Sequence, residues 1–266
     1  MGRPMIWKVI GQSVIGLSHL QGNKLCEDAV AFNTITREDN GDVLVAFVSD
    51  GAGSAKYAKE ASQKAVDTAV ERANLLLTDG NGIGESELIE IAETVYDVLN
   101  DMAQKNEVSL NDYSCTLLGV IVFPDKACFI QIGDGAIVRL TGENHYSHIW
   151  WPSNGEYQNS TVFLIDDVNL RHLQTKVIYE AVDELAIFTD GLQSLVLINE
   201  TLSVHQPFFN NLFAALRIAQ NEEQVQSLND RLRGYLSSDT INNRTDDDKT
   251  LLLATKLNKS ENGIQK

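Results

Sequence analysis

The chain has 266 residues, 43% of them hydrophobic, and a formal net charge of -16, which describes a globular protein with enough apolar material for a packed core. The acidic excess excludes an electrostatic grip on nucleic acid or on an anionic membrane, because phosphate groups would be repelled, and no apolar run is long enough to span a bilayer. Three cysteines, Cys26, Cys115 and Cys128, lack the spacing of a disulfide framework or a zinc site and predict a reducing, cytoplasmic setting.

Strands are predicted at the start of the chain. The runs "MIWKVIGQSVIG" and "DAVAFNTIT" are rich in β-branched and aromatic residues, and the turn-like "REDNGD" joins the second run to "VLVAFVSD". This pattern predicts an antiparallel hairpin. From Ser54 to about Leu77, small and apolar residues then recur at three-to-four spacing, which predicts a helix with an alanine face. After the breaker "TDGNGIGES", a second helix is predicted from about Glu87 to Ala103.

The middle of the chain returns to strands. They are "SCTLLGVIVF", "ACFIQIGD" and "AIVRL", and the short turn "PDKA" between the first two predicts a meander. The segment 141–182 is mixed and rich in Asn, Ser and Trp, so we interpret it as a candidate flap insertion.

The last third predicts a strand "ELAIFTD", helical segments between about Leu192 and Tyr235, and a closing strand "TLLLATKL". Runs of strands separated by paired helices favour an α+β layered sandwich over a repeated βαβ unit. We expect a single domain over residues 1–257 and a disordered tail over 258–266.

Carboxylates mark the ends of the predicted strands. Three strand-like runs end in Asp-Gly, one begins at an acidic pair, and one follows an acidic triplet: Asp50, Asp134 and Asp190; Glu27 and Asp28; Asp246, Asp247 and Asp248. Taken singly, an Asp-Gly is most simply a turn. If neighbouring strands bring these ends together, each pair of like charges would repel by about 1–4 kcal/mol, so a cation is expected among them.

The chemistry of such a cluster follows from its ligand type. Oxygen ligands without His or Cys select hard cations such as Mg²⁺ or Mn²⁺. Two of these ions about 4 Å apart form a binuclear hydrolytic centre. A water that bridges them becomes hydroxide near neutral pH and attacks phosphorus.

The motif series carries a specific resemblance. In order, "CEDA", "SDGAGSA", "SCTLL", "IGDGAIVRL", "FTDGL" and "DDKTLLL" resemble the motifs of the metal-dependent protein serine/threonine phosphatases of type 2C, over about Ser18 to Leu253. The opening "GLSHLQGNKLCEDA" is particularly similar to a bacterial branch. The resemblance implies a four-layer αββα sandwich of two antiparallel β-sheets flanked by helix pairs. It also implies hydrolysis of phosphoserine and phosphothreonine in proteins by a metal-bridging hydroxide.

Carried over residue by residue, the resemblance implies two divalent cations, Mn²⁺ or Mg²⁺. Asp50 would bridge both ions, and the Gly51 carbonyl would bind one of them. Asp190 and Asp247 would complete the shell of the other, while Asp134 would help to bind a third, weaker ion.

The acidic pair Glu27 and Asp28 matches the pair that, in the family, holds metal-bound water or sits just behind it. Where the family usually has a phosphate-binding arginine, this chain has Asn23 with Lys24 beside it. Because Lys is a point charge without the bidentate fork of arginine, we hypothesise that Lys24 is a weaker phosphate clamp.

A second departure concerns the general acid. Many relatives have a histidine within the Asp-Gly-x-Gly motif, where this chain has Ala52. His19 is the candidate for protonating the leaving alcohol, because imidazole titrates in the suitable range; a structural role for it is the alternative.

Three other interpretations are open to test. A metal-binding module of the von Willebrand A type would need a serine at Ala52, and a nucleotide site at "DGNGIG" lacks a preceding strand. The third is a catalytically weak or inactive phosphatase-like regulatory protein, which the missing arginine favours and the intact Asp50, Asp190 and Asp247 oppose. For an active enzyme we expect a monomer whose partner is a phosphoprotein, the substrate of a bacterial Ser/Thr kinase.

Overall fold

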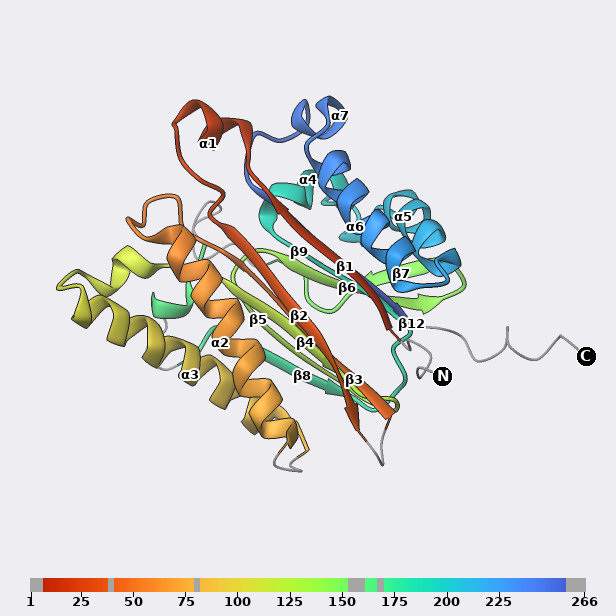
Figure 1. Ribbon diagram of the computed structural model, residues 1–266, viewed down its shortest axis with the longest axis horizontal. Helices are drawn as coiled ribbons and strands as arrows, with labels where there is room; N and C mark the ends of the chain where they lie inside the picture. Colours follow the sequence, from red (N-terminus) through yellow and green to blue (C-terminus); the bar gives the residue numbers. More distant parts are fainter. Residues whose placement is uncertain (1–6, 38–40, 79–81, 153–160, 167–169, 257–266) are drawn as a thin grey trace, which may run out of the picture.

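The computed structural model describes residues 7–37, 41–78, 82–152, 161–166 and 170–256. Within these ranges, two five-stranded antiparallel sheets pack face to face, and helices cover both outer faces (Figure 1). The predicted α+β four-layer sandwich is therefore confirmed. A search of the same ranges for a helix with the length and apolar character needed to cross a bilayer finds none.

The first sheet carries the predicted hairpins. Its strands, in spatial order, are β2 (Asp28–Arg37), β3 (Gly41–Asp50), β4 (Leu117–Val122), β5 (Ala127–Ile132) and β8 (Gln174–Ile178). Both the β2–β3 and the β4–β5 pairs are antiparallel, as predicted. Strand β3 is buried on both faces: Phe47 packs toward the helices, whereas the next residue, Val48, packs toward the second sheet. This alternation follows from the two-residue period of a strand.

The second sheet joins the two ends of the described chain. Its strands, in spatial order, are β1 (Trp7–Val14), β12 (Lys249–Lys256), β9 (Glu184–Phe188), β6 (Ala136–Gly142) and β7 (His145–His148). The predicted meander is wrong at its third strand, because β6 pairs with β9 and β7 rather than with β5. The chain changes sheets after Gly133, whose φ of +116° is a conformation that other residues rarely adopt.

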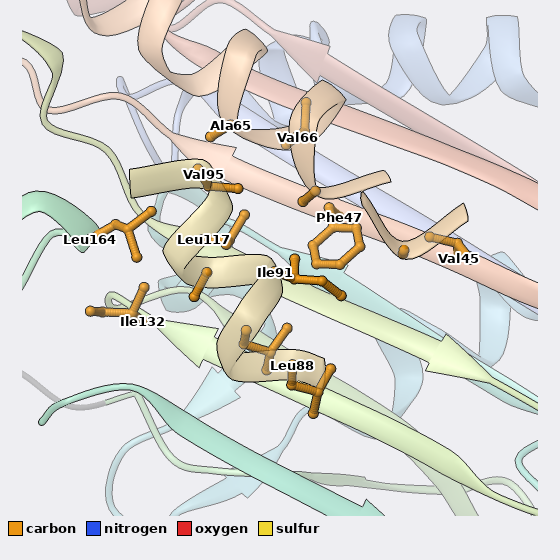
Figure 2. Packing of buried hydrophobic residues seen from close by; sticks show 14 of the residues in the cluster. Val45, Phe47, Ala65, Val66, Leu88, Ile91, Val95, Leu117, Ile132 and Leu164 are labelled. Carbon is orange, nitrogen blue, oxygen red and sulfur yellow. The ribbon is translucent and has the colours of Figure 1, made fainter. Parts of the chain in front are cut away.

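Two long helices cover the first sheet. They are α2 (Ala58–Thr78) and α3 (Glu85–Lys105). The alanine face of α2 is buried against the sheet, and Figure 2 shows Val66 of α2 and Ile91 of α3 close to Phe47 of β3. Helix α2 begins later than the predicted Ser54, because the backbone N–H of Tyr57 is bound by the Asp112 carbonyl outside the helix.

The second sheet is covered by α5 (Gln206–Ile218) and α6 (Glu222–Leu236), on the opposite side of the molecule from α2 and α3 (Figure 1). The remaining elements are short: α1 (Leu17–Gln21), α4 (Gln193–Val196), α7 (Asp239–Asn242), the 3₁₀ turns η1 (Leu110–Tyr113), η2 (Leu164–Asp166) and η3 (Asp190–Leu192), and the strands β10 (Leu197–Ile198) and β11 (Ser203–Val204).

The segment 141–182 contributes an edge strand to each sheet, β7 to the second and β8 to the first. Trp150 and Trp151 pack against two different hydrophobic clusters. The central part of the candidate flap, 153–160, and the predicted tail, 258–266, lie outside the described residues, so both interpretations stay predictions.

Candidate active site

Asp28 and Asp50 begin the site. They are the first residue of β2 and the last of β3, and they lie directly opposite each other in the antiparallel register. The Asp50 backbone is fixed by Thr116, whose Oγ1 accepts the Asp50 N–H at 2.9 Å and whose N–H donates to the Asp50 carbonyl at 2.8 Å. Thr116, the residue before β4, therefore sets where the Asp50 carboxylate emerges.

Gly51 fits a position that no larger residue could occupy. A Cβ there would lie 2.4 Å from the Ala58 carbonyl oxygen and 2.8 Å from the Glu27 carbonyl oxygen. The Gly51 N–H donates to that Glu27 carbonyl at 3.1 Å. The chain leaving Asp50 is thus confined between the first turn of α2 and the residue before Asp28.

Asp190 comes from the other sheet. It follows β9 and Thr189, and it begins the turn η3. A Cβ at the next residue, Gly191, would lie 1.9 Å from the Asp248 carbonyl oxygen, so this turn packs directly on the loop 246–248. The site is therefore assembled from both sheets.

Two oxygens of this group have no partner. Among the described residues, Asp28 Oδ1 and Asp190 Oδ1 are buried without a hydrogen bond. The other Asp28 oxygen, Oδ2, accepts from the hydroxyls of Thr189 and Thr250, both at 2.8 Å. Sequence reasoning missed these two threonines, although each stands in a quoted motif, "FTDGL" or "DDKTLLL".

The carboxylates act on one another through their charges. Burial raises the pKa of Asp50 well above its usual range, and the charges of Asp28 and Asp190 raise it further. Burial also raises the pKa of Asp28 to about 8, which the two threonine hydrogen bonds oppose and the Asp248 charge increases. The pKa of Asp190 is raised to about 6 by burial and then by the charge of Asp134. Such shifts indicate carboxylates that lack a counter-charge.

Asp134 lies where the chain passes from β5 to β6. Its Oδ2 accepts a hydrogen bond from the Thr161 hydroxyl, and its carbonyl accepts one from Gln193. Burial raises the pKa of Asp134, and the charge of Asp247 raises it further. Asp247 is half-buried, and its Oδ1 accepts the Asp248 N–H at 2.8 Å. The structure thus brings Asp134 and Asp247 into the same electrostatic neighbourhood as Asp190.

This donor set fits hard divalent cations. It consists of oxygens only, and two of them are buried without a hydrogen bond. The charges of Asp28 and Asp190 raise the pKa of Asp50, and the charge of Asp134 raises that of Asp190. In the part of the chain that the structure describes, no three His, Cys, Asp or Glu side chains already form a cation site by themselves.

Asp248 is the residue that sequence reasoning most clearly missed. It is buried, and it accepts hydrogen bonds from the Gly16 N–H at 2.6 Å, the Glu27 N–H at 2.5 Å and His19 Nδ1 at 2.9 Å. The acidic triplet in the sequence signalled a cluster, but nothing local indicated that the third carboxylate points inward.

His19 and Glu27 lie together beside Asp248. His19 Nε2 is 3.5 Å from Glu27 Oε2, and the Glu27 side chain is mostly buried. With a carboxylate at Nδ1, that ring nitrogen carries the hydrogen. The structure therefore orients the imidazole, while its predicted role as general acid stays a prediction.

Lys24 reaches the same group from the surface. Its Nζ donates to the Gly53 carbonyl at 2.9 Å and lies 3.3 Å from Glu27 Oε1. Asn23 adopts a φ of +54° in the turn after α1, a conformation that asparagine tolerates well. These contacts put Lys24 on the loop that leaves Asp50, where its cation is exposed to solvent.

Cys26 lies close to the carboxylates but is not a thiolate. Burial raises the pKa of its thiol, and the charges of Asp28 and Asp248 raise it further.

Comparisons with known proteins identify the family of the chain. A family model for protein phosphatase 2C matches residues 15–237. The Escherichia coli (strain K12) serine/threonine-protein phosphatase 3 is 35% identical over 251 residues, which cover 94% of this chain and 98% of that one.

Solved structures share the fold. The serine/threonine phosphatase Stp1 from Staphylococcus aureus has a TM-score of 0.60 at 16% identity, covering 97% of this chain and 98% of that one. RsbX in complex with magnesium has a TM-score of 0.54 at 15% identity, covering 96% and 98%. From the family match and the E. coli relative together, the chain belongs to the protein phosphatase 2C family of metal-dependent serine/threonine phosphatases.

Proposed function

We propose that this chain hydrolyses phosphoserine and phosphothreonine in proteins at the carboxylate cluster formed by the two sheets. The observation that carries the proposal is the relation of Asp50 to Asp190: they come from different sheets, yet each shifts the other's pKa, and the Asp190 Oδ1 is buried without a partner among the described residues. A site of this kind is suited to hold cations and a phosphoryl group.

Two divalent cations, Mn²⁺ or Mg²⁺, would be held by Asp50, the Gly51 carbonyl, Asp190 and Asp247, and a third by Asp134. When bound, they supply Lewis-acid charge for the phosphoryl oxygens and lower the pKa of water to make it a nucleophile. A protein of the same fold supports a divalent ion, since RsbX was solved in complex with magnesium.

The chain's own residues position these groups. Thr116 holds the Asp50 backbone, so that its carboxylate leaves β3 in one direction. The hydroxyls of Thr189 and Thr250 hold Asp28 Oδ2, which leaves Oδ1 free to accept a proton or a hydrogen bond from water. Asp28 is thereby suited to orient water beside the ligands rather than to bind the substrate.

The substrate phosphate would meet Lys24, whose Nζ is fixed by the Gly53 carbonyl at 2.9 Å. As an imidazolium with hydrogens on both ring nitrogens, His19 would donate the Nε2 proton to the leaving alcohol and keep the Nδ1 hydrogen bond to Asp248. Both roles depend on these side chains changing partner when substrate binds, because both also contact Glu27.

The biological partner would be a phosphoprotein made by a bacterial Ser/Thr kinase, and the enzyme would act as a monomer in the cytoplasm. The named relatives come from bacteria, E. coli and S. aureus. The cysteines, Cys26, Cys115 and Cys128, are free, in keeping with a reducing compartment.

The test is hydrolysis of a phosphothreonine peptide with Mn²⁺, with Mn²⁺ plus chelator, and with Asp190→Asn. We expect turnover only in the first condition. Asp246→Asn is the matched control, because Asp246 is exposed in the same loop as Asp247 and its side chain has no proposed role. Activity that resists both chelator and Asp190→Asn would refute the mechanism. Tight Mn²⁺ binding without any turnover would instead favour the inactive, regulatory alternative.

A further inference from the structure

The carboxylates at this end of the molecule are of two kinds. Asp28 and Asp190 each have a buried oxygen without a hydrogen-bond partner among the described residues, as expected of groups that bind something else. Asp248 is different, since both of its oxygens are used: Oδ1 by the Gly16 N–H, and Oδ2 by the Glu27 N–H and His19 Nδ1. It is 3% exposed. A carboxylate that already accepts three hydrogen bonds is placed to hold protein segments rather than a cation.

The segment that Asp248 holds is fixed mainly by polar contacts. Helix α1 has no buried residue, and Leu20 and Leu25 are 52% and 62% exposed. Apolar packing therefore cannot determine where this segment lies. Its other attachments are polar as well. The N–H and the hydroxyl of Ser18 both donate to the Asp246 carbonyl, at 2.9 and 2.8 Å, and at the far end Lys24 Nζ donates to the Gly53 carbonyl at 2.9 Å.

The approach of the two segments is very close at Gly16. A Cβ there would lie 2.2 Å from the Asp247 carbonyl carbon, so only glycine lets the segment reach the loop. The same loop thus carries one proposed metal ligand, Asp247, and one carboxylate, Asp248, that ties down the segment leading to Asp28.

We infer that Asp248 is a positioning residue of this site: its carboxylate fixes Gly16, His19 and Glu27 against the loop 246–248, and so places Asp28 opposite Asp50. The inference rests on the proposed metal site, although the Asp248 carboxylate accepts its hydrogen bonds from groups that are not proposed metal ligands. Groups that orient metal ligands in this indirect way typically change metal affinity by about 10–100-fold when they are replaced.

The experiment is calorimetric titration of Mn²⁺ into the wild-type chain and into Asp248→Asn. The asparagine keeps the volume but has one acceptor atom in place of two, so at least one of the backbone N–H groups loses its partner. We expect Mn²⁺ affinity to fall by about 10–100-fold. Asp246→Asn, which removes the same charge from the same loop, should change it less than about threefold. Equal losses of Mn²⁺ affinity in the two variants would mean that only the removed charge matters, and this result would overturn the inference.

A second readout separates positioning from general stability. If Asp248 acts through the ligands, saturating Mn²⁺ should restore part of the phosphopeptide turnover of Asp248→Asn, because Asp50, Asp190 and Asp247 are still present; the loss that remains would reflect the orientation of His19. In addition, ¹⁵N NMR should show the hydrogen on Nδ1 of His19 in the wild type and a mixture of tautomers in the variant. Normal Mn²⁺ affinity together with an unchanged His19 signal would overturn the inference.

A third measurement needs no variant. In the wild-type protein the Gly16 and Glu27 amide hydrogens should exchange slowly, although their segment is near the surface. Fast exchange at both would contradict the inference even if Asp248→Asn failed to fold. Metal titration and hydrogen exchange do not require turnover, so a failure of the proposed phosphatase activity would be seen separately.

Discussion

Asp28 lies directly opposite Asp50 across the β2–β3 pair, so two carboxylates occupy facing positions at the end of one hairpin. Like charges in facing positions destabilise a sheet. The burial that raises both pKa values adds to this cost. The arrangement therefore favours binding of a cation over stability of the metal-free fold.

Removing one of these charges should show that trade-off. We expect Asp50→Asn to abolish Mn²⁺-dependent hydrolysis. The loss of activity should exceed the roughly 100-fold effect of replacing a residue that only orients a metal ligand. In the presence of chelator, the same variant should be more stable than the wild type by on the order of 1 kcal/mol, because a repulsion is removed. Chemical denaturation with and without chelator measures both parts. A variant that is less stable in chelator would contradict this account of Asp50.

The metal-free protein should lose stability as the pH rises. The carboxyl pKa values in the folded state lie above those of the unfolded chain, so protonation favours the fold. That contribution is complete below about pH 4 and is lost as pH rises through about 6 for Asp190 and about 8 for Asp28. Thermal unfolding in chelator at several pH values between these limits tests this. Mn²⁺ should reverse the trend, because it binds the ionised carboxylates. A melting temperature in chelator that does not change with pH would contradict the raised pKa values of these carboxyl groups.

Replacing Lys24 should weaken substrate binding. We expect Lys24→Ala to raise the KM for a phosphothreonine peptide about 3- to 10-fold with little change in kcat, as a partly exposed charge contact worth about 1 kcal/mol would. Lys64→Ala, an exposed lysine on α2, is the control. An unchanged KM in Lys24→Ala would leave the phosphate contact to another group.

Replacing His19 tests the general acid. We expect His19→Gln to lower kcat and to remove one ionisation from the pH–rate profile, because glutamine can donate a hydrogen bond but cannot transfer a proton. Its Nδ1 partner, Asp248, would lose a donor, so Mn²⁺ affinity should be measured alongside. If the profile keeps its shape, the ring has a structural role only.

A change far from the site should affect stability alone. Glu184 is buried and accepts two hydrogen bonds from Arg217, both at 2.6 Å, together with one from the Tyr146 hydroxyl. Arg217→Ala would leave this carboxylate buried without its cation, which we expect to cost about 2–4 kcal/mol. This loss of stability is at the lower end of the range for buried ion pairs, because the Arg217 side chain is 35% exposed. Urea denaturation measures the cost, and Mn²⁺ affinity should not change.

Much of the fold follows from local patterns. The two-residue alternation of β3 and the alanine spacing of α2 are properties of the sequence itself, so both elements were predicted close to their observed positions. The sheet that each strand joins is not determined by the local sequence. Strand β6 follows β5 after a short turn, yet it pairs with β9, which lies far along the chain. A pattern of apolar residues cannot distinguish these partners.

The site, like the fold, could be predicted only in part from the sequence. Asp50 and Asp190 end apolar runs, and strand ends in a layered sheet meet at an edge, so their gathering could be expected. The inward direction of Asp248 could not, because its partners Gly16, His19 and Glu27 are more than 200 residues away in the chain. Hydrogen bonds over such separations depend on the completed fold.

The origin of Asp50 and Asp190 in different sheets has a consequence for the protein's lifetime. An ion bound to both would cross-link the two layers at this edge, and its binding free energy would then oppose their separation. Local separation of the end of β9 from the end of β3 should become rarer as the Mn²⁺ concentration rises. Protease cleavage near this edge should slow in proportion. Manganese supply would in that case set the cellular amount of the enzyme as well as its turnover.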